Sequence, residues 1–199
     1  MNLGERVRRG ITAGQAQQLE AQLGGPPRGP VGEGVNTMDL ILWRHAEAEE
    51  LADGLDDPAR GLTPKGERHA RRVADWLNRF LPATTKVLVS PALRSQQTAE
   101  ALGRRFKVVE ALGPEGTVEG LLAAARWPDA REPVLVVGHQ PTLGLAAAYL
   151  MTGARLVDAS GGALTPWSIK KGSVWWLRHR PREDRGEVVL VAVRSAEQM

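Results

Sequence analysis

The chain has 199 residues, of which 42% are hydrophobic and 25% are charged, and this size and composition are typical of one soluble globular domain. It contains no cysteine, so disulfides, thiolate catalysis and Cys-based zinc sites are excluded, and we expect a cytoplasmic protein. The formal net charge is only +3, and no apolar run approaches the roughly 18 residues of a membrane span. We therefore expect neither nucleic acid nor a membrane as a partner.

Residues 1–37 differ in composition from the rest of the chain. They are rich in Gly, Gln, Arg and Pro, with the run Gly-Gly-Pro-Pro-Arg-Gly-Pro at 24–30. Such a segment buries too little apolar surface to offset the entropy of folding. We expect a disordered tail over residues 1–37 and one domain over residues 38–199, with Met38 as a candidate second translation start.

The first predicted strand is the apolar run 40–43, which stops at the polar sequence Arg44-His45-Ala46-Glu47. A short apolar run bounded by polar residues indicates a buried strand. In open α/β sheets the ligand site lies just beyond the carboxyl ends of such strands. Arg44 and His45 therefore occupy a position where chemistry is usually carried out.

A helix is predicted over residues 64–80. Thr63 suits its N-cap and Pro64 its first position, and apolar residues then recur at helical spacing. Its arginines fall largely on the other face and have no stacking aromatic residues among them. This pattern indicates a solvated face rather than a nucleic-acid site.

Two further apolar runs, 87–89 and 134–137, repeat the arrangement of the first strand. Arg94 follows the second strand in the first turn of a predicted helix, and His139 follows the third strand directly. Three parallel strands of one sheet would bring these residues to the same edge as Arg44 and His45. Two permanent cations and two imidazoles facing one crevice suit a dianion, and phosphate is the commonest dianion in a cell.

The remaining elements complete the predicted fold. They are helices over 92–104, 118–126 and 141–151, and strands over 173–178 and 187–193 joined by a charged turn. We expect an α/β fold, a three-layer sandwich in which a mostly parallel central sheet carries helices on both faces and an antiparallel hairpin at its edge.

Three motifs, in this order and spacing, resemble the signatures of the histidine phosphatase superfamily, which is also called phosphoglycerate mutase-like. They are Arg44-His45-Ala46, the segment Ser-Pro-Ala-Leu-Arg-Ser-Gln-Gln-Thr-Ala at 90–99, and Gly138-His139-Gln140-Pro141. Within the superfamily the chain looks most like the small SixA-type phosphohistidine phosphatases, in which an Arg-x-Leu-Thr-x-x-Gly stretch follows the first motif, as at 60–66 here. The resemblance covers Met38 to about Ser195. A single triplet would not be specific, but the ordered set of three is.

The resemblance implies a phosphatase that works through a covalent phosphohistidine. We expect neither a cofactor nor a metal, because Arg44 and Arg94 already supply the positive charge that a metal ion would bring. It assigns the nucleophile to His45, the grip on the phosphoryl oxygens to Arg44 and Arg94, a further hydrogen bond to His139, and assistance in phosphate binding to Arg60. In this chemistry a neutral imidazole nitrogen attacks phosphorus in line, and water then hydrolyses the phosphoenzyme.

The general acid and the substrate are less well defined by the sequence. Candidates for the acid, by position alone, are Glu47, Asp57 and Glu115. Only 17 residues lie between His45 and Thr63, and only 26 between Phe106 and Pro133, whereas larger members of the superfamily carry long insertions in these loops that cover the site. We therefore expect an open cleft that admits phosphohistidine on a signalling protein of the histidine phosphotransfer type, or a small phosphorylated compound.

Other functions stay open at this point. A phosphatase or mutase for small phosphate esters would be favoured by a clear acid and a lid, and a non-catalytic module that binds phosphoproteins would be favoured by loss of the nucleophile. A metal site formed by His45, His139 and Glu47 is a weaker alternative, because no known metal-binding spacing is present. A serine hydrolase built on Ser90 lacks the Gly-x-Ser-x-Gly elbow.

Overall fold

The computed structural model describes residues 37–51, 56–154, 156, 163–182 and 186–199. The expected tail over residues 1–37 therefore lies outside the described residues, except for its last position. Within the described part of the chain, no helix has the length and apolar character needed to cross a membrane.

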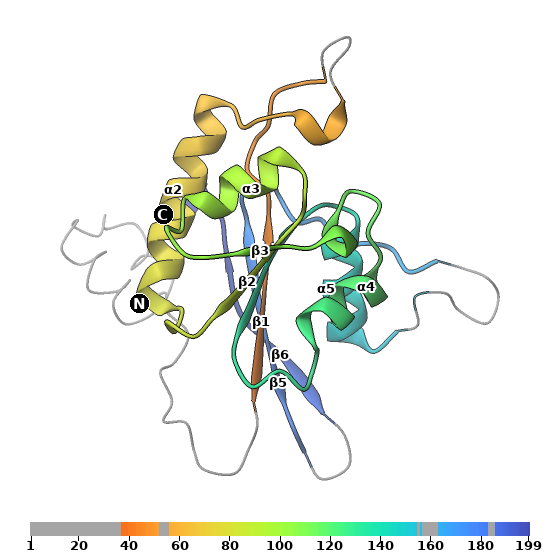
Figure 1. Ribbon diagram of the computed structural model, residues 1–199. Coiled ribbons are helices and arrows are strands. Elements are labelled where there is room, and N and C mark those ends of the chain that lie inside the picture. The colour runs from red at the N-terminus through yellow and green to blue at the C-terminus, as the bar shows by residue number, and fades with distance from the viewer. Residues whose placement is uncertain (1–36, 52–55, 155, 157–162, 183–185) are drawn as a thin grey trace, which may run out of the picture. The chain divides into compact units, whose positions relative to one another are not determined.

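One sheet forms the centre of the domain. In the described residues its strands are β1 (Met38–Arg44), β2 (Lys86–Val89), β3 (Lys107–Val108), β4 (Val134–Gly138), β5 (Val174–Arg180) and β6 (Glu187–Arg194). Their order is β3-β2-β4-β1-β5-β6 (Figure 1). The first four strands pair in parallel, whereas β5 pairs antiparallel with both β1 and β6. The expected mostly parallel sheet with an antiparallel edge hairpin is confirmed.

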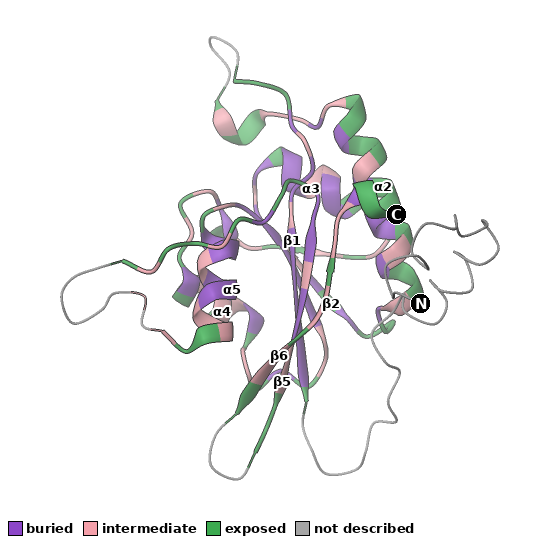
Figure 2. Ribbon diagram, turned by 180° about the vertical axis from the view of Figure 1, so that it is seen from behind, coloured by how far each residue is buried: buried purple, intermediate pink, exposed green. Residues whose placement is uncertain are grey.

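Helices cover both faces of this sheet (Figure 1). α2 (Pro64–Phe80) and α3 (Leu93–Glu100) contribute to the apolar cluster on one face, and α4 (Val118–Ala125) and α5 (Thr142–Thr152) to the cluster on the other. Figure 2 shows buried residues in the strands and on the helix faces that meet them. The predicted three-layer sandwich is therefore confirmed.

The strand β1 lies in the interior of the sheet and is buried on both faces. Leu40 and Leu42 belong to the cluster on the α4 and α5 side, whereas Ile41 and Trp43 belong to the cluster on the α2 and α3 side. All four side chains are fully buried. This double burial explains why the strand reads as a continuous apolar run rather than as an alternating pattern.

The helix α2 forms as its sequence predicts. The Thr63 hydroxyl caps the helix by accepting a hydrogen bond from the Gly66 N–H at 2.9 Å, and Pro64 occupies the first position. Val73 and Leu77 lie on the buried face. The exposed face carries Arg68, Arg71, Arg72 and Arg79. The arginines therefore lie on the exposed face of α2, as the sequence predicts.

Two details differ from the expected elements. The helix α3 ends at Glu100 rather than near residue 104. The chain turns soon afterwards at Gly103, whose φ of 63° lies in the left-handed region that glycine adopts without strain. The loop after β1 contains a short 3-10 helix, η2 (Asp57–Ala59), which is not among the elements expected from the sequence. Of the two, η2 lies at the predicted site, because Asp57 contacts Arg94.

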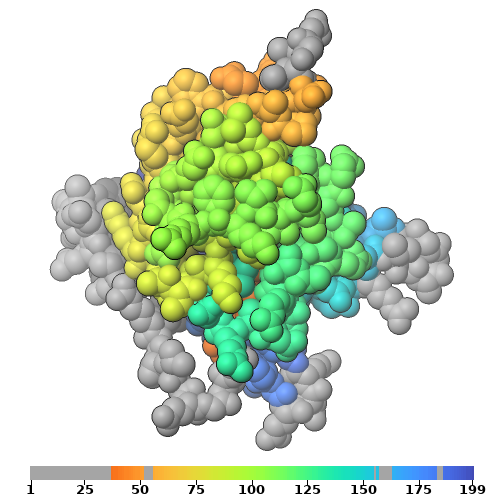
Figure 3. Space-filling view, in the orientation of Figure 1, coloured from red at the N-terminus to blue at the C-terminus, as the bar shows by residue number. Residues whose placement is uncertain are grey.

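The strand register brings the predicted site residues to one edge. Arg44 of β1 is level with Gly138 of β4, and Val89 of β2 is level with Val137 of β4. The residues that follow these three strands therefore emerge together at the carboxyl edge of the sheet. Figure 3 shows the segment around η2 (orange) next to α3 (yellow-green), so the loop after the first motif lies beside the second motif.

Candidate active site

His45 is held rigidly at the end of β1. Its side chain is 6% exposed, and its backbone N–H donates to the Gly138 carbonyl at 3.1 Å. The ring Nδ1 lies 2.8 Å from the Ala46 carbonyl oxygen. Because a carbonyl can only accept, the proton of the neutral ring is on Nδ1, and Nε2 keeps its lone pair.

The charge state of His45 favours a nucleophilic role. Burial, together with the nearby His139, Arg94 and Arg44, lowers the pKa of His45 to about 3, against the opposing effect of the hydrogen bond to Ala46. The ring is therefore neutral at pH 7, so the Nε2 lone pair is available to react.

His139 faces His45 from the end of β4. The ring centroids lie 5.1 Å apart, and His139 is 4% exposed. Its Nε2 is 2.7 Å from the Ser90 hydroxyl oxygen and 3.4 Å from that of Ser95. Burial, and after it the charge of Arg94, lowers the pKa of His139 to about 4, against an opposing effect of Asp57. His139 is therefore also neutral at pH 7.

Arg44 and Arg94 each bring a buried guanidinium donor that has no acceptor. Arg44 Nη1 donates to the Ile169 carbonyl at 2.7 Å, while Arg94 donates through Nη1 and Nη2 to Asp57 at 2.7 and 2.8 Å. In both residues the buried Nε–H finds no partner among the described residues. An unsatisfied buried donor costs free energy, so a bound anion that accepts from these donors would offset this cost.

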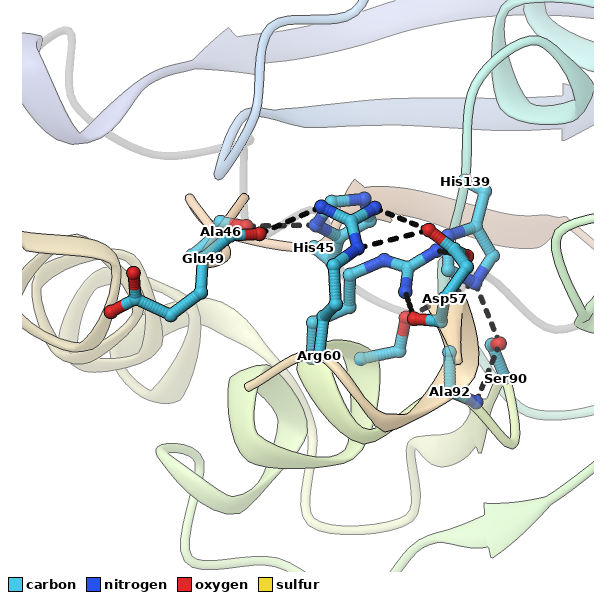
Figure 4. A network of polar contacts seen from close by, with 10 residues as sticks. His45, Ala46, Glu49, Asp57, Arg60, Ser90, Ala92 and His139 are labelled. Carbon is cyan, nitrogen blue, oxygen red and sulfur yellow. Dashed lines mark hydrogen bonds and ion pairs between the residues drawn. The ribbon is translucent and has the colours of Figure 1, made fainter. Parts of the chain in front are cut away.

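Arg60 is linked to Arg94 through the Asp57 carboxylate. Its Nε donates to Asp57 Oδ1 at 2.9 Å, and its Nη1 donates to the Glu49 carbonyl at 2.8 Å (Figure 4). Asp57 Oδ2 accepts from Arg94, so one carboxylate joins both guanidinium groups. The sequence places Arg60 in a loop with an assisting role, and the structure brings it next to Arg94.

Of the three acid candidates, Asp57 is in direct contact with the site arginines. Glu47 instead bonds to Thr63 and Lys65, both at 3.0 Å, at the start of α2. Glu115 is exposed and precedes Gly116, whose carbonyl accepts from the Thr142 hydroxyl at 2.7 Å. Glu47 is therefore turned toward a helix cap, and Glu115 lies in a loop that contacts the start of α5.

The charge state of Asp57 does not suit a proton donor in the ligand-free protein. Burial raises the pKa of Asp57, but hydrogen bonds from Arg94 and Arg60, together with their charges, outweigh burial and leave this pKa below its ordinary value. Asp57 is therefore ionised at neutral pH. Its carboxylate acts on the arginines as a counter-ion.

A metal site formed by His45, His139 and Glu47 finds no support in the geometry. The hydrogen bonds of Glu47 point to α2, and no group of three or more potential ligands is present in the part of the chain that the structure describes. Ser90 does not resemble an exposed serine nucleophile either, because it is fully buried against His139.

The structure adds supporting residues that the sequence pattern does not identify. Thr98 of α3 accepts a hydrogen bond from the Ala46 N–H at 3.0 Å and donates to the Arg94 carbonyl at 2.6 Å, which links the first and second motifs. Gly172, with a φ of 73°, donates its N–H to the carbonyls of Arg44 and His45. The Lys-Lys-Gly sequence at 170–172 signals a turn, but it does not reveal which residues the turn contacts.

Comparison with known proteins agrees with this geometry. A sequence model of the histidine phosphatase superfamily (branch 1) matches residues 40–114. An uncharacterised protein of Picosynechococcus is 39% identical over 158 residues, which span 73% of this chain and 93% of that protein. Phosphohistidine phosphatase SixA of Escherichia coli is 34% identical over 125 residues, which span 58% of this chain and 76% of the enzyme.

A solved structure shares the same fold. Protein histidine phosphatase SixA, in complex with tungstate, superposes with a TM-score of 0.62 at 26% identity, and the match covers 80% of this chain and 97% of that one. The family model and the aligned relatives point to the same family as the three motifs, which meet at the carboxyl edge of the sheet. The chain therefore belongs to the histidine phosphatase superfamily and is a phosphatase similar to the SixA enzymes.

Proposed function

We propose that this phosphatase removes the phosphoryl group of phosphohistidine on a protein, through a covalent phosphohistidine formed on His45. The observation that carries the proposal is the hydrogen bond between His45 Nδ1 and the Ala46 carbonyl at 2.8 Å. It fixes the neutral tautomer whose free Nε2 lone pair is the nucleophile that the reaction needs.

In the first step the His45 Nε2 lone pair forms a bond to phosphorus, and the bond from phosphorus to the leaving nitrogen of the substrate breaks. The electron pair of that bond stays on the leaving imidazole, which departs as a neutral group because its other ring nitrogen carries a proton, while His45 keeps its own proton on Nδ1. Arg44 and Arg94 hold the negative phosphoryl oxygens during the transfer, with their buried Nε–H groups among the available donors. In the second step water attacks the same phosphorus and the bond to His45 breaks, with its electron pair returning to Nε2. The protons of the water go to the phosphate, which is released as dihydrogen phosphate and loses one proton to the solvent.

The leaving group decides which substrates such a site can process. The conjugate acid of imidazole has a pKa near 6.5, so imidazole leaves as a neutral group with little help from an acid. An alkoxide leaving from a phosphate ester needs a proton from a well-placed acid. In this site Asp57 contacts the two arginines, and its low pKa keeps it ionised. This favours phosphohistidine over esters.

The short loops around the site favour a protein substrate. Only 17 residues lie between His45 and Thr63. Part of this loop forms η2, in which Asp57 contacts Arg94. The relative in Escherichia coli bears the name phosphohistidine phosphatase, and we transfer that substrate class to this chain. A histidine phosphotransfer domain is the kind of partner that would present such a group.

The test compares leaving groups at neutral pH. We expect a much higher kcat/KM on a phosphohistidine protein and on a model phosphoramidate than on sugar phosphates or phosphoserine peptides, because all of these carry a similar dianion and differ in leaving group and access. In parallel, label from the phosphohistidine protein should appear on the enzyme in an acid-labile, base-stable form. Faster hydrolysis of a small ester than of every phosphohistidine substrate would instead assign the protein to the ester phosphatases.

A further inference from the structure

Ser90 contacts His139 in a way that the reaction scheme above does not use. The Ser90 hydroxyl lies 2.7 Å from His139 Nε2 and accepts a hydrogen bond from the Ala92 N–H at 3.2 Å. Ser90 is fully buried. Figure 4 shows Ser90 below the His139 ring, with Ala92 on its other side. The hydroxyl is thus held between a backbone donor and the imidazole.

The direction of the proton in this contact follows from the donors available. An amide N–H can only donate, so the Ser90 oxygen is an acceptor toward Ala92. If His139 Nε2 also carried a proton, the Ser90 oxygen would accept twice and its own O–H would have no acceptor among its contacts in the described structure. A buried donor without a partner is costly. The Ser90 O–H therefore donates to an unprotonated Nε2.

We propose that Ser90 is a positioning residue, which fixes neutral His139 in the tautomer with the proton on Nδ1 so that a donor faces the phosphoryl group. The proposal deepens, and for its kinetic test rests on, the phosphatase reaction proposed above. A neutral imidazole has one N–H, so His139 can donate to a phosphoryl oxygen only from the nitrogen that Ser90 does not occupy. In the opposite tautomer a lone pair would face the oxyanion and repel it.

The two site histidines then carry the same tautomer for different purposes. In His45 the Nδ1 proton is held by the Ala46 carbonyl, which leaves a lone pair for attack on phosphorus. In His139 the lone pair on Nε2 is occupied by Ser90, which leaves the Nδ1 proton for the substrate. One histidine is prepared as a nucleophile and the other as a hydrogen-bond donor.

The tautomer can be measured directly, without substrate. NMR of the full chain labelled with 15N-histidine at pH 7, with signals assigned through His69→Gln and His179→Gln, distinguishes protonated from unprotonated ring nitrogens. We expect His139 to show a protonated Nδ1 and an unprotonated Nε2. A protonated Nε2 in the wild-type protein would overturn the proposal, and this readout is independent of whether phosphohistidine is the substrate.

Kinetics of Ser90→Ala give the second test, with Ser95→Ala as the matched control. Ser95 is also a fully buried serine near the same nitrogen, but its hydroxyl is 3.4 Å away. Ser90→Ala should lower kcat/KM by about ten- to a hundredfold or more, in the range for loss of a group that orients a catalytic histidine. In Ser95→Ala the His139 tautomer should be unchanged and the loss clearly smaller. A loss in Ser95→Ala as large as in Ser90→Ala would contradict the proposal.

The pH profile separates a tautomer effect from general damage to the fold. An imidazolium carries both N–H groups, so protonation of His139 restores the donor whichever tautomer the neutral ring prefers. The groups that act on His139 are Arg94, Asp57, Arg44 and Arg60, with His45 opposite, and all of them are kept in Ser90→Ala. Because the pKa of His139 is about 4, the defect of the variant should therefore shrink as the pH falls from 6 toward 4. A constant defect over this range, with the wild-type tautomer retained in the variant, would show that Ser90 acts only structurally.

Discussion

The Asp57 carboxylate bonds to two arginines of the site, Arg94 in α3 and Arg60 in the loop after β1. Arg94 Nη2 donates to one carboxylate oxygen at 2.8 Å, and Arg60 Nε donates to the other at 2.9 Å. In the ligand-free protein this carboxylate uses guanidinium donors that could otherwise bind phosphoryl oxygens. A phosphoryl group must therefore either displace Asp57 or bind beside it, with a negative charge close to its own.

Replacing Asp57 by asparagine should strengthen phosphate binding. Asp57→Asn keeps the shape of the side chain and removes the charge that competes for Arg94 and Arg60. We expect the inhibition constant of inorganic phosphate to fall by about three- to tenfold, a modest effect because the Asp57 side chain is 39% exposed and its charge is screened. Competitive inhibition assays measure the constant. Weaker phosphate binding in the variant would mean that Asp57 mainly holds the arginines in place.

Replacing His45 by alanine should abolish turnover without unfolding the protein. The side chain projects from the end of β1 and contributes no apolar burial to the core, whereas loss of a covalent nucleophile normally costs about three or more orders of magnitude in rate. Activity on a phosphohistidine substrate and thermal melting measure the two effects. His69→Ala, which changes a half-buried histidine on α2, serves as the control. Residual activity of His45→Ala above about a hundredth of wild type would contradict the nucleophile assignment.

Stability should fall as the pH is lowered from 7 to 5, because of the buried histidines. The pKa of His45 is lowered to about 3 and that of His139 to about 4, from 6.5. Below pH 6.5 the unfolded chain takes up protons that the folded protein still excludes, so the free energy of unfolding decreases as the pH falls through this window. Denaturant titrations at pH 7 and pH 5 measure the difference. It should be smaller in His139→Gln than in the wild type.

The edge of the sheet that carries the site was predictable from the sequence, because each strand that ends at this edge is recognisable as a short apolar run followed by polar residues. The run 40–43 ends at Arg44-His45 and the run 134–137 ends at Gly138-His139, and parallel pairing of the two strands in the structure places Arg44 level with Gly138. Local pattern was sufficient here because the strands are buried on both faces and their carboxyl ends meet at one edge.

The contacts that tune the site were not predictable, because they depend on packing between distant parts of the chain. Asp57, Glu47 and Glu115 were equivalent as acids by position, and only the path of the loop shows that Asp57 meets Arg94 while Glu47 meets Lys65. The contact of Ser90 with His139 spans 49 positions. No periodicity or propensity encodes such a pairing, since it depends on the register between β2 and β4.

Residues 1–37 should be dispensable for folding and activity. The Gly/Pro-rich composition of this segment supplies little apolar surface, whereas Met38, at 1% exposed, already belongs to the core of the domain. A chain that starts at Met38 should melt at nearly the same temperature as the full chain and hydrolyse phosphohistidine at the same rate. A fall of many degrees in Tm would show instead that the segment packs on the domain.

Activity should not depend on a metal ion, because the site already carries the positive charge that a metal would bring to the phosphoryl group. Arg44 is half-buried and Arg94 is buried, and each has a buried Nε–H without an acceptor among the described residues. Two such cations stabilise the charge on transferring oxygens as a magnesium or zinc ion does elsewhere. Saturating EDTA should therefore leave kcat/KM on phosphohistidine unchanged, whereas Arg94→Lys, which keeps a charge but loses the planar fork, should lower it. If EDTA abolishes activity and one added metal restores it, the metal site at His45 and His139 becomes the better account of the catalytic centre.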